Sequence, residues 1–133
     1  MEINWEALHA SAISIMKQAY APYSKFPVGV AGLVDDGRIV VGCNVENASY
    51  GLGLCAECGL VSALQASGGG RLIAVYCVDA HGTALAPCGR CRQLLLEHGG
   101  KELQVMGESG IMTMADLLPW AFDANELHRG ESK

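Results

Sequence analysis

Two pairs of cysteines with the spacing of metal ligands, Cys55-x-x-Cys58 and Cys88-x-x-Cys91, are the most chemically distinctive feature of the sequence. Four cysteines in two such pairs are typical of a structural zinc site. Glu57, however, stands inside the first pair. A carboxylate has no role beside a closed four-thiolate zinc, whereas beside a zinc with three protein ligands it can hydrogen-bond a water in the open position. The pattern therefore supports two hypotheses, a structural four-cysteine site and a catalytic three-cysteine site.

The surroundings of the two pairs favour the catalytic hypothesis. Each pair begins a predicted helix instead of lying in the glycine-rich turns of zinc ribbons, and 133 residues can bury a core without a metal. Unpaired N–H groups at a helix N-terminus lower a cysteine pKa, so we expect Cys55, Cys88 and Cys91 to lie where deprotonation is favoured. The two helix starts would then converge on one metal. The other two cysteines, Cys43 and Cys77, lie in β-rich runs and are predicted to be buried apolar residues.

The elements that position these cysteines alternate between helix and strand. The first predicted helix is capped by Asn4 and runs to about Ala19, and the second begins at Cys55 and stops at 67–70. A third begins at 87–89 and stops at 99–100, and a single helical turn is predicted over 115–118. Predicted strands cover 28–34, 39–45, 72–78, 103–106 and 112–114. Asp35-Asp36-Gly37-Arg38 between the first two strands is typical of a hairpin turn.

This order predicts a single-domain α/β fold with three layers, in which helices cover both faces of a mixed central sheet. Strands joined by helices of about ten residues are brought in parallel, whereas the hairpin is antiparallel. We expect one domain over residues 1–128 and a polar C-terminal tail over 129–133.

Charge and hydropathy narrow the classes of partner. The formal net charge is −5 and no lysine or arginine cluster interrupts it, so a nucleic-acid partner is disfavoured and a small molecule is favoured. No apolar run approaches the roughly 18 residues of a membrane span, and the N-terminus has no targeting pattern. We therefore expect no membrane association and a cytoplasmic location, where the six cysteines stay reduced.

Several motifs in order resemble one enzyme family. Cys55-Ala56-Glu57 followed by Pro87-Cys88-Gly89-Arg90-Cys91 resembles the zinc deaminase signature. Together with further segments, the chain is similar to the small homotetrameric cytidine deaminases from its first helix to about Leu127. Those segments are Tyr23–Gly29, Gly42–Gly51, Cys91-Arg92-Gln93 and Leu117-Leu118-Pro119-x-x-Phe122.

The resemblance implies a cytidine deaminase-like fold and a role for each residue of the signature. Cys55, Cys88 and Cys91 would hold one Zn²⁺ per chain, with a water in the fourth position. Glu57 would take a proton from this water, deliver it to N3 of the pyrimidine and later protonate the departing amino group. The activity implied is hydrolytic deamination of cytidine and 2′-deoxycytidine in pyrimidine salvage.

The resemblance also implies substrate contacts, some of them across subunit interfaces of a homotetramer. These substrate-binding residues are Phe26, Asn44, Glu46, Tyr50, Ala56 and Phe122. Asn44 and Glu46 alternate on an extended segment, so their side chains share one face. The resemblance implies that they bind the ribose 3′-hydroxyl. Ordinary structural roles stay open: an edge-strand surface for Asn44 and Glu46, and the core for Phe26.

Three questions stay open. The alternatives to cytidine are another small aminopyrimidine nucleoside-like substrate or, from a different class, a four-cysteine zinc module that binds a protein partner. A 3′-hydroxyl contact does not distinguish ribose from deoxyribose.

Most members of the family carry Arg where this chain has Cys58, and that Arg hydrogen-bonds the zinc thiolates. We expect the helix N-termini to supply most of the compensation, with Arg90 or Arg92 as substitutes and Cys58 as a thiol donating to a ligand sulfur.

Overall fold

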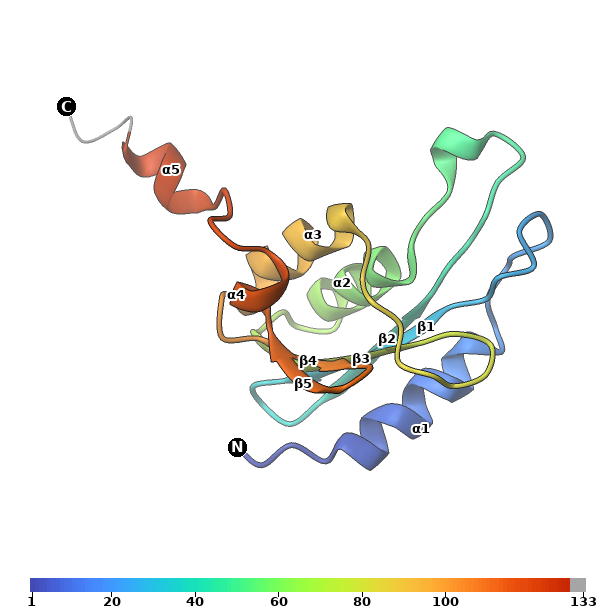
Figure 1. Cartoon of the computed structure of the whole chain (residues 1–133), viewed down its shortest axis with the longest axis horizontal. Coiled ribbons are helices and arrows are strands. Elements are labelled where there is room, and N and C mark those ends of the chain that lie inside the picture. The colour runs from blue at the N-terminus through green and yellow to red at the C-terminus, as the bar shows by residue number, and fades with distance from the viewer. Residues whose placement is uncertain (130–133) are drawn as a thin grey trace.

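A mixed five-stranded sheet forms the middle layer of the structure, a computed structural model that describes residues 1–129 (Figure 1). Its strands are β1 (Gly29–Val34), β2 (Ile39–Cys43), β3 (Leu72–Val78), β4 (Gln104–Gly107) and β5 (Gly110–Thr113). The order across the sheet is β2-β1-β3-β4-β5, with β3 and β4 parallel and the other neighbouring pairs antiparallel. The predicted mixed sheet is confirmed.

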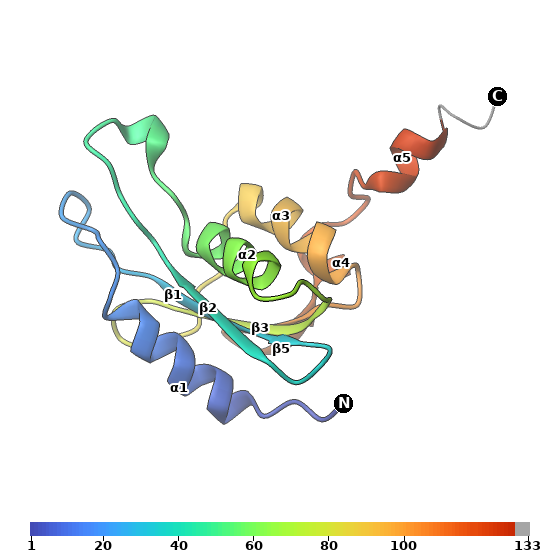
Figure 2. The ribbon, with the colours of Figure 1, turned by 180° about the vertical axis from the view of Figure 1, so that it is seen from behind.

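The helices of the chain are α1 (Trp5–Met16), the 3₁₀ helix η1 (Tyr50–Leu52), α2 (Ala56–Ala66), α3 (Gly89–Gly99), α4 (Met114–Leu117) and α5 (Ala124–Arg129). The longer ones, α1, α2 and α3, cover the two faces of the sheet. In Figure 2, α1 lies on one side of the sheet and α2 and α3 lie on the other. The three-layer α/β prediction is confirmed. Within the described part of the chain, no helix combines the length and the apolar character that crossing a membrane requires.

The central strand β1 is buried along its whole length because both of its faces carry a core. Val30 and Val34 belong to the larger core, which includes the apolar residues of α2 and α3. Ala31 and Leu33 point the other way and pack with Leu8 and other residues of α1. The larger core thus fixes the two helices that begin with the cysteine pairs.

The predicted helices and strands differ from the observed ones mainly at their ends. The side chain of Asn4 caps α1 as expected, accepting a hydrogen bond from the Ala7 N–H at 3.0 Å. The helix ends at Met16 instead of about Ala19, because the next N–H groups bond carbonyls three residues back and the chain turns away. The second strand ends at Cys43 and not at residue 45.

Two segments extend away from the layers (Figure 1). One is the stretch between β2 and α2 that contains η1, predicted only as a turn. The other is α5, which the sequence did not predict and which contains no buried residue. Arg129, the first residue of the predicted tail, is the last residue of α5, and residues 130–133 lie outside the described part of the chain.

Candidate active site

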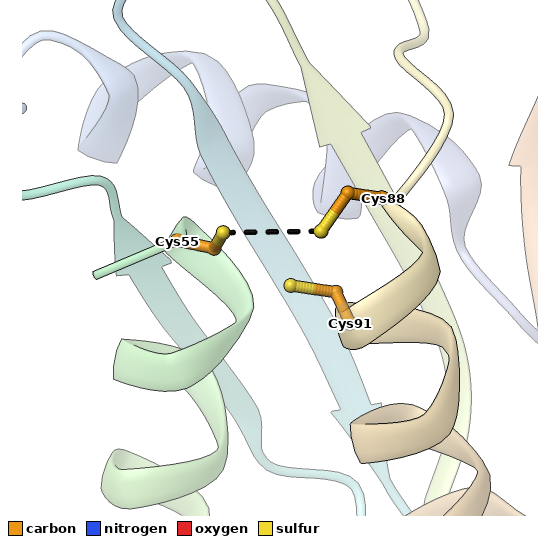
Figure 3. A group of neighbouring side chains, drawn as sticks. All are labelled: Cys55, Cys88 and Cys91. Atoms are coloured by element: carbon orange, nitrogen blue, oxygen red, sulfur yellow. Dashed lines mark hydrogen bonds between the residues drawn. The ribbon is translucent and has the colours of Figure 1, made fainter. Parts of the chain in front are cut away.

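Cys55 and Cys88 occupy the same local position, the N-cap of a helix. Both have extended backbone angles, and their carbonyl oxygens accept the first helical hydrogen bonds, from Cys58 and Arg92 at 3.0 and 2.9 Å. The Cys55 side chain makes no cap hydrogen bond to its own helix, which leaves its sulfur free to face the other cysteines. Cys91 follows in the first turn of α3 and is fully buried. The expected convergence of two helix starts is confirmed (Figure 3).

The three sulfurs are close enough to share one metal ion. The Sγ atoms of Cys55, Cys88 and Cys91 all lie within 4.8 Å of one another, and those of Cys55 and Cys88 are 3.9 Å apart. Tetrahedral zinc, with bonds of about 2.3 Å to sulfur, sets its sulfur ligands about 3.8 Å apart. The spacing and the soft sulfur donors therefore fit zinc.

Cys58 is not part of this group. Its Sγ instead accepts a hydrogen bond from Nη1 of Arg90 at 3.1 Å. This arrangement differs from the expected donation by Cys58 to a ligand sulfur. It does not support the hypothesis of a four-thiolate structural site, because the fourth cysteine of the two pairs is engaged elsewhere.

Glu57 is a buried carboxylate in the first turn of α2, only 4% exposed. It lines a cavity of about 160 Å³ together with two of the clustered cysteines. The lining residues are Val28, Asn44, Cys55, Ala56, Glu57, Cys77, Leu85, Ala86 and Cys88. Because the rest of this lining is apolar, a flat ring entering the cavity would meet one carboxylate, one amide and three cysteine sulfurs among the side chains.

Cys77 is a neighbour of Glu57 that the sequence analysis assigned only to the core. Burial raises the pKa of the Cys77 thiol, and the charge and hydrogen bonding of Glu57 raise it further. The thiol thus stays protonated beside the carboxylate. Strand alternation was the available signal, since Cys77 shares its side of β3 with Val75, which faces α2 and α3.

The pKa values of the clustered cysteines correct one expectation. Burial raises the pKa of Cys55 and of Cys91, and the charge of Glu57 adds to the effect. At Cys88 burial also acts to raise the pKa, but hydrogen bonds from the Cys91 backbone and from neighbouring sulfurs outweigh it, and the net shift is downward. Among the three clustered cysteines, only Cys88 therefore has a lowered pKa. A cation bound among the three sulfurs would offset the effect of burial on the other two thiols and release their protons.

Asn44 and Glu46 both hold the segment that precedes β1. The amide oxygen of Asn44 accepts from the Val28 N–H at 2.8 Å, and its nitrogen donates to the carbonyl of Phe26 at 2.9 Å. Glu46 accepts from the backbone N–H groups of Tyr23 and Ser24 at 3.0 and 3.1 Å and from the Ser24 hydroxyl. These Ser24 and Tyr23 contacts lower the pKa of Glu46. Both side chains thus face one segment, as strand alternation predicts.

The structure does not bring every predicted substrate contact into one cavity. Asn44 and Ala56 line the cavity of Glu57, whereas Glu46 and Tyr50 line a separate hollow of about 350 Å³. Phe26, Tyr50 and Phe122 are 50%, 83% and 58% exposed, and none of them lines the cavity of Glu57. A single chain therefore leaves these aromatic side chains largely uncovered.

Arg92 and Gln93 support the start of α3. Arg92 donates to the carbonyls of Pro87 and Leu117, both at 2.8 Å, and Gln93 donates to the carbonyl of Phe122 at 2.7 Å. These bonds fasten the loop before Cys88 and the segment after α4 to the helix that carries two clustered cysteines.

Comparison with known proteins places this geometry in a family. The sequence-family model of the cytidine and deoxycytidylate deaminase zinc-binding region matches residues 3–107 of this chain. The chain is 56% identical over 128 residues to the cytidine deaminase of Mycobacterium tuberculosis, which covers 96% of both chains. It is 36% identical to that of Halalkalibacterium halodurans, covering 92% of this chain and 97% of the relative.

Solved structures of cytidine deaminases also match this chain. The crystal structure of cytidine deaminase from Mycobacterium leprae matches with 64% identity and a TM-score of 0.87, over 89% of this chain and 99% of that one. The crystal structure of cytidine deaminase from M. tuberculosis matches with 57% identity and a TM-score of 0.90, over 92% of this chain and 99% of that one. These matches, together with the three cysteines clustered at two helix starts, show that the chain belongs to the cytidine and deoxycytidylate deaminase family that carries a zinc-binding region.

Proposed function

We propose that the protein catalyses the zinc-dependent hydrolytic deamination of cytidine and 2′-deoxycytidine to uridine and 2′-deoxyuridine, with release of ammonia. One observation carries the proposal: a buried carboxylate, Glu57, shares a small apolar cavity with the sulfurs of Cys55 and Cys88. The names of relatives at 56% identity support the choice of cytidine over other aminopyrimidine nucleosides.

In this proposal Cys55, Cys88 and Cys91 hold one Zn²⁺ per chain. The ion supplies Lewis acidity that lowers the pKa of water from about 15.7 toward neutrality. Glu57 accepts the proton that the attacking water loses and passes it to N3 as the water oxygen bonds to C4. Glu57 then takes the proton of the new C4 hydroxyl and gives it to the amino group, the C4–N bond breaks, and ammonia leaves as the C4 carbonyl forms.

Residues around Glu57 orient the ring. Asn44 and Ala56 line the cavity, and the apolar side chains of Val28 and Leu85 exclude water from it. We assign ribose binding to Asn44 and Glu46, because both belong to one extended segment and both already hold the loop that carries Phe26.

We further propose a homotetramer with active sites at subunit interfaces. The cavity of Glu57, about 160 Å³, is smaller than the roughly 300 Å³ at which small-molecule sites begin. Exposed aromatic side chains at Tyr50, Trp120 and Phe122 can complete it from neighbouring copies. We take residues 1–128 as one domain of a cytoplasmic enzyme, since its cysteines are all free thiols.

The test combines zinc content with turnover. Purified protein should contain one zinc per chain, and the ultraviolet spectrum of added cytidine should change to that of uridine. Comparing initial rates on cytidine and 2′-deoxycytidine then resolves the sugar preference. Protein that holds zinc but leaves both nucleosides unchanged would contradict the proposed substrate.

A further inference from the structure

An arginine on α3 contacts a sulfur on α2 immediately beside the clustered cysteines. Arg90 lies between Cys88 and Cys91 in sequence, and its Nη1 donates to Sγ of Cys58 at 3.1 Å. Cys58 directly follows Glu57 in the first turn of α2. The contact therefore joins the first turns of the two helices that supply the clustered sulfurs.

The charges around these sulfurs indicate a role for the contact between Arg90 and Cys58. Three thiolates outnumber the two positive charges of Zn²⁺, and the buried carboxylate of Glu57 adds another negative charge. Arg92 also lies in the first turns of α3, but its guanidinium is committed to the carbonyls of Pro87 and Leu117. Arg90 instead directs its charge at sulfur, from the helix that carries two of the clustered cysteines.

We propose that Arg90 is a positioning residue that stabilises the zinc-loaded site by acting through Cys58. The guanidinium offsets the excess negative charge of the thiolates, and its bond to Cys58 fixes the distance between the starts of α2 and α3. This inference rests on the proposed ligands Cys55, Cys88 and Cys91. It gives Cys58 a function outside the metal's ligands, as the acceptor for Arg90.

The role predicts an effect on zinc retention that exceeds any effect on folding. Arg90 is exposed and its partner is half-buried, so their hydrogen bond contributes little to the stability of the metal-free chain. Loss of a group that supports metal ligands typically costs about 10- to 100-fold in metal affinity or activity. Substitution of a surface residue without this role would leave the zinc affinity unchanged.

The first experiment measures zinc transfer from the purified, zinc-loaded protein to a chromophoric chelator. Arg90→Ala should raise the zinc dissociation constant about 10- to 100-fold, and Arg90→Lys, which keeps the charge, should recover part of the loss. Lys17→Ala is the matched control, because it removes the same charge from the end of α1 on the opposite face of the sheet. Equal zinc affinity for Arg90→Ala and Lys17→Ala would overturn the inference.

The second experiment tests the route through Cys58. Cys58→Ala should release zinc as readily as Arg90→Ala, and the double variant should lose no more than either single variant, because one interaction is removed in each case. Losses that add independently would overturn the route. Absorption of the Co²⁺-substituted protein, which reports sulfur ligation directly, should shift in both single variants alike.

The outcomes separate this inference from the proposed function. Purified wild-type protein without zinc would overturn both. Wild-type protein that holds zinc and deaminates cytidine, with Arg90→Ala releasing zinc no faster, would overturn the role of Arg90 alone.

Discussion

Gly42 of β2 lies directly against the carbonyl oxygen of Ala56, the first residue of α2. A Cβ at position 42 would come within 2.3 Å of that oxygen and 2.4 Å of the Leu60 nitrogen, both of them backbone atoms. Since backbone atoms cannot rotate aside, only glycine lets α2 approach β2 this closely. The approach sets the depth at which Cys55 and Glu57 enter the cavity.

Gly42→Ala should therefore both destabilise the fold and loosen the metal site. Overpacking of this kind costs about 1–3 kcal/mol, and displacement of α2 moves Cys55 relative to the α3 cysteines. Urea unfolding and zinc transfer to a chelator measure the two effects. Gly51→Ala is the control, because a Cβ there meets nothing within 4 Å. Unchanged zinc affinity in Gly42→Ala would refute the link between this packing and the site.

Substituting each cysteine of the two pairs should divide them into three ligands and one supporting residue. Cys55→Ser, Cys88→Ser and Cys91→Ser should each lose zinc, because each removes one of the clustered sulfurs. Cys58→Ser should retain one zinc per chain and substantial activity, because a hydroxyl oxygen can still accept from Arg90. Metal analysis of the dialysed variants gives the answer. If Cys58→Ser lost zinc like the other three, a four-thiolate structural site would become the better assignment.

Glu57→Gln should keep zinc and nucleoside binding yet lose nearly all turnover. The amide preserves the volume but cannot carry the proton, and general acid–base catalysis contributes typically about 10²- to 10⁴-fold. Steady-state kinetics with a parallel zinc measurement test this. Turnover within about tenfold of wild type, below that range, would contradict the proposed mechanism.

The fold was largely predictable because its main elements follow local rules. Leu72–Val78 was predicted to the residue, since an apolar run flanked by glycines and polar residues fits a buried strand. The hairpin turn was predictable from Gly37, whose φ of 94° suits glycine. In contrast, α5 buries none of its residues in the chain, so its sequence has no apolar periodicity to detect.

The candidate site was less predictable where it depends on tertiary contacts. The spacing of the cysteines indicated a metal group, and Glu57 together with the family resemblance left Cys58 out of it, as the clustered sulfurs do. The actual partner of Cys58 was not predicted. The contact between Arg90 and Cys58 joins two helices 32 residues apart in sequence, and periodicity does not report which residues meet across such an interval. The position of Cys77 beside Glu57 was missed, although strand alternation places Cys77 on the side of β3 that faces α2 and α3.

The lowered pKa of Glu46 predicts how stability depends on pH. Hydrogen bonds from Ser24 and Tyr23 favour the ionised carboxylate and hold its pKa below the ordinary value of 4.5. The stabilisation is therefore present in full above pH 4.5 and is lost as the pH falls through the lower pKa of the folded state. Thermal melting of wild type and Glu46→Gln between pH 7 and 3 should show a difference in Tm that shrinks toward the acid end. A difference that stays constant with pH would show that the charge of Glu46 is not involved.

Phe122 and the residues after it should act on a neighbouring subunit. The Phe122 side chain is 58% exposed although Gln93 fastens its carbonyl to α3, so the backbone is fixed while the ring is uncovered within one chain. We expect it to stack on the pyrimidine bound by another copy. Sedimentation at assay concentration should give a tetramer, and Phe122→Ala should raise KM about 5- to 150-fold, since aromatic stacking on a base is worth about 1–3 kcal/mol.

Truncation after Pro119 extends this test, because it removes both exposed aromatic residues of the segment, Trp120 and Phe122, together with α5. It should raise KM at least as much as Phe122→Ala. Truncation after Arg129 is the control, since it leaves Phe122 and α5 in place, and it should leave KM unchanged. Zinc content should stay at one per chain in both, because Cys55, Cys88 and Cys91 are retained. A fully active monomer would contradict both the tetramer and the contribution of Phe122 to a neighbouring site.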